Sequence, residues 1–151
     1  MGRRLVGLDA RHREAQQTWA ENARAYHRYV SSKDLCLTHA LTDPYYDPTK
    51  RASEQEDPDL ILYIVGETTA GPVVRGLRTL ATLAPVSDEA LVYPNRPREP
   101  EEFDYAIAFA IPMNTPGLKI VCRDLYAEHA DPERHPLTTR FDEVDAALIF
   151  R

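Results

Sequence analysis

A histidine and several threonines interrupt otherwise apolar stretches of the sequence. His39 lies within residues 35–42, beside Thr38 and three residues before Thr42. An imidazole has a proton available near neutral pH, so His39 could donate a hydrogen bond or serve in acid–base chemistry at a pocket. The same spacing is also compatible with a structural hydrogen bond inside the fold. Both interpretations stay open on the residues alone.

Thr79 and Thr82 raise the same question in residues 77–94. This stretch predicts a strand, a corner at Pro85 and a second strand that begins near Ala90 and ends at Pro94. Threonine is frequent in strands, so both hydroxyls could simply be part of a sheet. The alternative is that they face a bound molecule.

No motif for a metal or a phosphate is present. The histidines lack the HxxxH and HExxH spacings, and neither cysteine has a partner at CxxC distance. We therefore expect no metal site. The two glycines at Gly66 and Gly71 are explained by a hairpin turn. Cys36 and Cys122 stand far apart in apolar surroundings, which predicts reduced, buried thiols in a cytoplasmic protein.

The composition indicates one ordinary domain of 151 residues with 43% hydrophobic and 28% charged residues. The net charge is -6 and the basic residues are scattered, which argues against nucleic acid as a partner. The longest apolar runs, residues 60–65 and 105–113, are far shorter than the roughly 20 residues of a membrane span. We expect no membrane segment.

Hydrophobic periodicity predicts one helix followed by six or seven antiparallel strands. The helix covers residues 9–31, with Asp9 as its N-cap. Gly76 is expected to form a bulge in the third strand. The predicted strands are residues 35–42, 60–67, 72–84, 90–94, 104–111, 118–123 and 137–150. The fold class is therefore mainly β.

Three segments together resemble the 4-hydroxyphenylacetate 3-hydroxylase family, the oxygenase components of two-component flavin monooxygenases. They are DLCLTHALTDP at 34–44, VRGLRTLATLAP at 74–85 and HPLTTRFDEVD at 135–145. The resemblance implies an acyl-CoA-dehydrogenase-like architecture. Residues 1–33 would end a truncated N-terminal helical domain, and residues 34–151 would form a β-barrel-like middle domain. By the same resemblance, the C-terminal helical bundle, which also builds the homo-oligomer in full-length relatives, would be missing from these 151 residues.

The resemblance also implies an activity and a set of contacts. Reduced FAD from a separate flavin reductase would react with O2, and a phenol such as 4-hydroxyphenylacetate would be hydroxylated ortho to its hydroxyl group. His39 would lie by the flavin and the substrate and donate a hydrogen bond. Leu41, Thr42 and Thr82 would contact the flavin. Pro94 and Asn95 would lie in the substrate-facing loop.

The sequence departs from the family pattern at several positions. Pro94-Asn95 stands where hydroxyl residues are common, and Tyr45 replaces an amide side chain. The Arg-x-Pro-Asp-Tyr motif that relatives carry some forty residues before the Thr-His pair has no place here. We therefore expect weak flavin binding and little hydroxylation by this chain alone. The alternatives are a catalytically inactive β-domain fragment that serves as an interaction or assembly module, or a protein whose remainder is encoded nearby.

Overall fold

The computed structural model describes residues 5–44, 47–57, 59–69 and 71–151. The chain divides between Leu35 and Cys36 into two compact units. The first contains helix α1, Leu5–Lys33. The predicted helix is confirmed, but it begins four residues earlier, so Asp9 lies inside it and the predicted N-cap is wrong. Its end is a left-handed Asp34, φ 53°, after which the Leu35 amide donates to the Val30 carbonyl at 3.2 Å.

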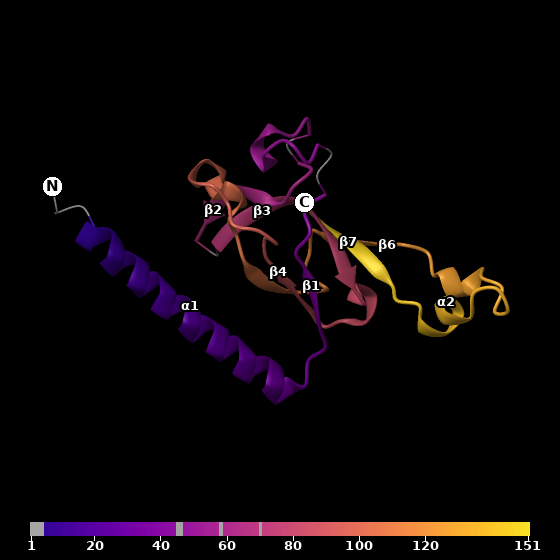
Figure 1. The fold of residues 1–151 in the computed structure, drawn as a ribbon. Helices are drawn as coiled ribbons and strands as arrows, with labels where there is room; N and C mark the ends of the chain where they lie inside the picture. Colours follow the sequence, from indigo (N-terminus) through magenta and orange to yellow (C-terminus); the bar gives the residue numbers. More distant parts are fainter. Residues whose placement is uncertain (1–4, 45–46, 58, 70) are drawn as a thin grey trace. The chain divides into compact units, whose positions relative to one another are not determined.

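The second unit contains seven strands in two sheets (Figure 1). The three-stranded sheet has the order β1-β4-β5, and the four-stranded sheet has the order β2-β3-β7-β6. The strands are β1 Leu37–Ala40, β2 Tyr63–Thr68, β3 Gly71–Thr82, β4 Glu89–Val92, β5 Phe109–Pro112, β6 Leu118–Cys122 and β7 Asp145–Phe150.

The prediction of an antiparallel, barrel-like domain is therefore only partly right. The unit is mainly β, but its strands form two separate sheets, and β1 pairs with β4 in parallel. Parallel neighbours need a long connection, and here residues 41–88, which include the β2–β3 hairpin, provide it. An isolated bridge between Thr42 and Thr79 links the stretch after β1 to β3.

The β2–β3 hairpin is confirmed, with Thr68 opposite Gly71; Ala70, in the predicted turn, lies outside the described residues. Gly76, however, is not the expected bulge. It has φ 118°, and a Cβ there would lie 2.6 Å from the Ile61 carbonyl oxygen, so glycine is needed for close backbone approach. The register shifts occur instead at residues 64–66 of β2 and 78–81 of β3.

Two predicted strands are wrong in their first part, which is helical. Residues 104–111 begin in a 3₁₀ helix, Pro100–Tyr105, and only the last part belongs to β5. Residues 137–150 begin in a short helix, α2, Pro136–Phe141, before β7. In both cases proline occupies the first turn, where its fixed φ suits a helix and its missing N–H is not needed. Within the 3₁₀ helix, Tyr105 stacks on Tyr63, with ring centroids 5.4 Å apart.

Both sheets contribute to one hydrophobic core. Small residues allow close packing, and the rings of Phe109 in β5 and Phe150 in β7 meet edge to face at 5.8 Å. The fully buried members include Ala40, Leu62, Ala81, Ala90, Val92 and Leu148. Cys36 and Cys122 are free thiols as predicted, but both are exposed, so the prediction that they are buried is wrong.

Within the described residues, neither helix has the length and apolar character required to cross a membrane.

Candidate functional site

His39 lies on the face of the three-stranded sheet that is opposite the hydrophobic core. Side chains alternate along β1, so Thr38 and Ala40 are buried while His39 points to the opposite face and is exposed. The register places His39 beside Leu91 of β4, and Leu91 beside Ala110 of β5. These three residues form a row across the sheet, which we call the His39 row. Among the described residues, the His39 side chain has no hydrogen bond or ion pair, so the structural interpretation finds no support.

The stretch after β1 is held by neighbouring backbone. The Asn95 amide donates to the Leu41 carbonyl at 3.1 Å. The Thr42 carbonyl accepts from the Thr79 amide at 2.9 Å and from the Thr79 hydroxyl at 3.1 Å. The Thr79 hydroxyl is thus part of the sheet, which is the structural alternative that the sequence left open for it. Three of the expected site residues, Leu41, Thr42 and Asn95, lie close together here, and Pro94 precedes Asn95 and is half-buried.

Thr82 is the last residue of β3, and its hydroxyl proton is already used in a hydrogen bond within the protein. Its hydroxyl donates to Asp145 Oδ1 at 2.7 Å, and its carbonyl accepts from the Thr38 hydroxyl at 2.6 Å. Thr38 and His39 point to opposite faces of β1, and among the described residues no hydrogen bond or ion pair joins the His39 side chain to Thr82. The bond from Thr38 therefore joins the end of β3 to the strand that carries His39.

The backbone on either side of Thr82 is unusual. Leu80 and Leu83 both have φ 59°, in the left-handed region that side-chain-bearing residues rarely adopt. Both leucines are also exposed, by 54% and 46%. Left-handed residues and exposed leucines at the end of one strand indicate a constrained backbone, with both leucine side chains outside the core to which Ala81 belongs.

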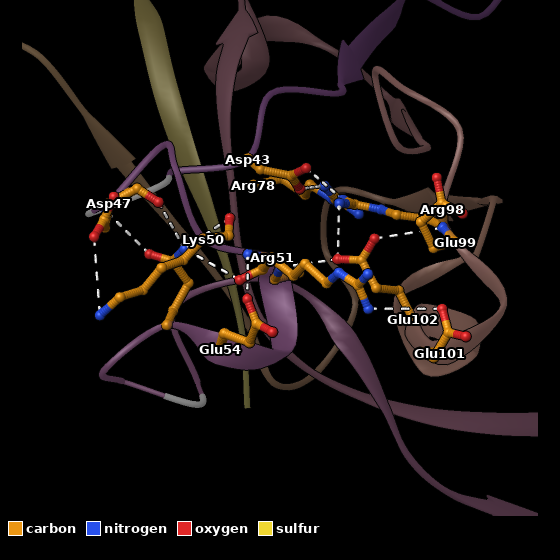
Figure 2. Close-up of polar contacts among 12 residues, drawn as sticks. Asp43, Asp47, Lys50, Arg51, Glu54, Arg78, Arg98, Glu99, Glu101 and Glu102 are labelled. Atoms are coloured by element: carbon orange, nitrogen blue, oxygen red, sulfur yellow. Dashed lines mark hydrogen bonds and ion pairs between the residues drawn. The ribbon is translucent and has the colours of Figure 1, made fainter.

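A buried ionic cluster lies next to these segments and was not predicted from the sequence (Figure 2). It consists of Asp43, Arg78, Arg98 and Glu102, which we call the Asp43 cluster. The Asp43 carboxylate is paired with both arginines, and Arg98 Nη1 lies 3.9 Å from Glu102 Oε1. The Ala52 amide donates to the same Glu102 oxygen at 2.8 Å. The signal that could have revealed the cluster is an arginine inside the apolar run 77–84, since a buried arginine needs a partner.

The Asp43 cluster balances two positive against two negative charges. Its side chains are 0%, 0%, 2% and 6% exposed, in the order of the chain. Burial, and secondly the charge of Arg98, lower the pKa of Arg78 to about 10, which still leaves it charged at neutral pH. Among the described residues, Arg78 Nε and Nη2 have no hydrogen-bond partner. The contribution of this cluster to the free energy of folding therefore depends strongly on the ion pairs with Asp43.

Two open hollows lie away from the His39 row. One, of about 530 Å³, is lined by residues of the segment 126–138, and the other, of about 420 Å³, by residues from 57–60, 75–77 and 149–151. None of the expected site residues lines either hollow. In the part of the chain that the structure describes, no group of three His, Cys, Asp or Glu side chains is arranged to hold a metal ion. The candidate site is thus a sheet face and its bordering segments.

Comparison with known proteins connects these segments to one family. The family described as 4-hydroxyphenylacetate 3-hydroxylase N terminal matches residues 5–151. The 4-hydroxyphenylacetate 3-monooxygenase oxygenase component of Thermus thermophilus is 42% identical over 132 residues, which cover 87% of this chain and 27% of that protein. The oxygenase component of the same name from Geobacillus sp. is 40% identical, over 91% of this chain and 28% of that protein.

A solved structure agrees with the sequence comparison. The oxygenase component of 4-hydroxyphenylacetate 3-monooxygenase, in complex with FAD and 4-hydroxyphenylacetate, is similar to this chain with a TM-score of 0.74 and 43% identity. The match covers 87% of this chain and 27% of that one. The chain thus spans about a quarter of the length of the relatives that it matches.

Proposed function

The chain belongs to the 4-hydroxyphenylacetate 3-hydroxylase family, and we propose that its β unit carries part of the flavin and phenol site of a flavin-dependent aromatic hydroxylase. The observation that carries this proposal is the His39 row: an exposed imidazole without a structural partner among the described residues, set beside apolar neighbours on the sheet face opposite the core. A polar side chain on such a surface is available to a ligand.

The chemistry of the available groups fits a flavin ring. A flat, largely apolar ring requires a flat apolar surface with a few polar groups at its edge. Leu91 and Ala110 provide apolar surface beside His39, and the Thr42 side chain has no hydrogen bond among the described residues. The Thr82 hydroxyl donates to Asp145, so toward a ligand it can only accept, for example from a ring N–H.

Each of these residues would then have a definite task. When bound, reduced FAD would supply the electrons with which one atom of O2 enters the phenol ring and the other leaves as water. His39 would lie beside both the flavin and the phenol and would donate a hydrogen bond to the flavin or to the phenol oxygen, which is a role suited to an imidazole. Leu41, Thr42 and Thr82 would hold the flavin, and Leu91 would help to exclude water.

The remaining assignments are proposals by family membership. Residues 34–151 would correspond to the middle β domain, and Pro94 and Asn95 would border the phenol. Relatives named as oxygenase components imply a separate partner that delivers reduced flavin, here a flavin reductase. The replacement of hydroxyl residues by Pro94-Asn95 leaves the particular phenol open within the class of para-substituted phenols.

The proposal is tested by titration of the purified chain with FAD, oxidised in air and reduced under anaerobic conditions, with flavin fluorescence and absorbance as the readouts. We expect weak binding that His39→Ala weakens further. His129→Ala is the matched control, because His129 is also exposed but lies at the end of the 3₁₀ helix Tyr126–Glu128. Oxygen and 4-hydroxyphenylacetate are then added, and the dihydroxy product is sought by chromatography. Equal FAD binding by the unaltered chain and His39→Ala would contradict the proposal.

A further inference from the structure

We propose that Asp43 is a positioning residue that fixes three segments of the site in one arrangement through the buried ion pairs of the Asp43 cluster. The segments are the stretch after β1, strand β3 and the loop after β4. The inference rests on the proposed function only for what these segments bind, since the geometry of the cluster is independent of any ligand.

Each segment reaches Asp43 from a position close to an expected contact residue. Asp43 directly follows Thr42 in the chain. Arg78 belongs to β3, four residues before Thr82, and Arg98 follows Asn95 by three residues. The Asp43 carboxylate thus forms ion pairs with both Arg78 and Arg98, as Figure 2 shows. Flavin-facing and substrate-facing segments therefore share a single buried anchor.

The loop after β4 depends most on this anchor. Asn95, Arg96 and Pro97 are exposed, and so is Glu99, yet the Arg98 side chain between them is only 2% exposed. Burial of a guanidinium is costly unless it is paired, so the loop keeps this conformation because Arg98 has its partners. The backbone bond between the Asn95 amide and the Leu41 carbonyl, 3.1 Å long, lies three residues from the buried pair.

Glu102 is the second acidic partner of Arg98. Its Oε1 lies 3.9 Å from Arg98 Nη1 and accepts from the Ala52 amide at 2.8 Å. Arg98 therefore lies between two acidic groups, which restricts its guanidinium in two directions. Arg78 holds Asp43 from β3, where Thr79 is separately bonded to the Thr42 carbonyl.

This division of contacts predicts a selective effect. Loss of Arg98 removes the anchor of the loop but leaves the bonds between Thr79 and Thr42. The Asn95 amide should lose much more protection from hydrogen exchange than the Thr79 amide does. A residue with a merely structural role would lower the protection of both amides together, because both would exchange through global unfolding.

The test compares Arg98→Met with the unaltered chain by NMR-detected amide exchange without flavin. We expect exchange at Asn95 to accelerate at least tenfold more than exchange at Thr79. Arg98→Lys, which keeps the charge, should restore part of the protection. Arg51→Met is the matched control, because Arg51 pairs with Glu101 at 3.7 Å on the surface, and it should alter neither amide. Unchanged exchange at Asn95, or equal acceleration at both amides, would overturn the inference; if Arg98→Met does not fold, Arg98→Lys is judged by the same criterion.

Binding measurements on the same variants connect the anchor to function. Titration with FAD and with 4-hydroxyphenylacetate should show at least fivefold weaker phenol binding for Arg98→Met. Unchanged affinity for both molecules, despite faster exchange at Asn95, would overturn the positioning role. If the unaltered chain binds no FAD while the exchange pattern is as expected, the proposed function fails and the anchor stands.

Discussion

His39 and Asp43 lie four residues apart in the chain and have opposite surroundings. His39 is exposed on the His39 row and has no partner among the described residues. The Asp43 side chain is fully buried and is shared by Arg78 and Arg98. One polar residue is thus free to meet a ligand, whereas the other is committed to holding the segments around it.

The difference separates two uses of polar residues in a β domain. A polar group that is buried must be satisfied by the protein itself, so its removal is expected to affect folding. A polar group that is exposed contributes little to folding, so its removal is expected to affect binding. Variants at the two positions should therefore give opposite results, and the following predictions run from the largest expected effect to the smallest.

Asp43→Asn should destabilise the chain most. The substitution leaves two buried arginines with a single acidic partner, and removal of one member of a buried pair costs about 3–5 kcal/mol. Urea unfolding measures the loss. Glu101→Gln, which removes an exposed partner of Arg51, is the control and should cost less than about 1 kcal/mol. Equal losses for the two variants would remove the distinction between buried and exposed pairs.

His39→Ala should leave the stability of the chain nearly unchanged and should weaken FAD binding. The free energy of unfolding should change by no more than about 0.5 kcal/mol, since the side chain is exposed and unpartnered. FAD affinity should fall about tenfold, which corresponds to about 1.4 kcal/mol and to the loss of one hydrogen bond. Unfolding and FAD titration on the same preparation check both parts. A large loss of stability with intact FAD binding would assign His39 a structural role.

Thr82→Val and Thr79→Val compare two hydroxyls in one strand. Each loses one hydrogen bond, to Asp145 and to the Thr42 carbonyl respectively, so each should cost about 1 kcal/mol of stability. Only Thr82→Val should also weaken FAD binding, because only Thr82 is proposed to accept a bond from the ring. FAD titration of both variants decides this. The same affinity for both would show that Thr82, like Thr79, is a sheet hydroxyl.

The stability of the chain at acidic pH should depend on another ion pair, between Arg123 and Asp142. Arg123 Nη2 lies 2.8 Å from Asp142 Oδ1, and this bond and the Ala127 amide hold the pKa of Asp142 below its ordinary value of 3.8. The unfolded chain therefore binds a proton at a higher pH than the folded chain does. The stabilisation is present above pH 3.8 and is lost as the pH falls through the lower, folded pKa. Thermal unfolding between pH 6 and pH 2.5 should show a weaker acid dependence in Asp142→Asn; an identical dependence would contradict this.

Family membership and most elements could be predicted from the sequence, because their signals are local. The three quoted motifs identified the family, and apolar periodicity located α1, the β2–β3 hairpin and β6. Errors arose where proline opened a helical turn, at Pro100 and Pro136, since apolar residues after a proline suit a strand as well as a helix. The expected contact residues stay predictions, although the structure brings Leu41, Thr42 and Asn95 together.

What the sequence alone determined is which polar residues interrupt apolar stretches; which of them are buried was decided only by the tertiary structure. His39 and Arg78 look alike in this respect, each a polar residue within an apolar strand. Their surroundings depend on partners distant in the chain: β4 pairs in parallel with β1 and leaves the His39 side chain exposed, whereas Asp43 reaches Arg78 and neutralises it. Desolvation depends on such long-range packing and not on neighbours in sequence, so it cannot be deduced from local pattern.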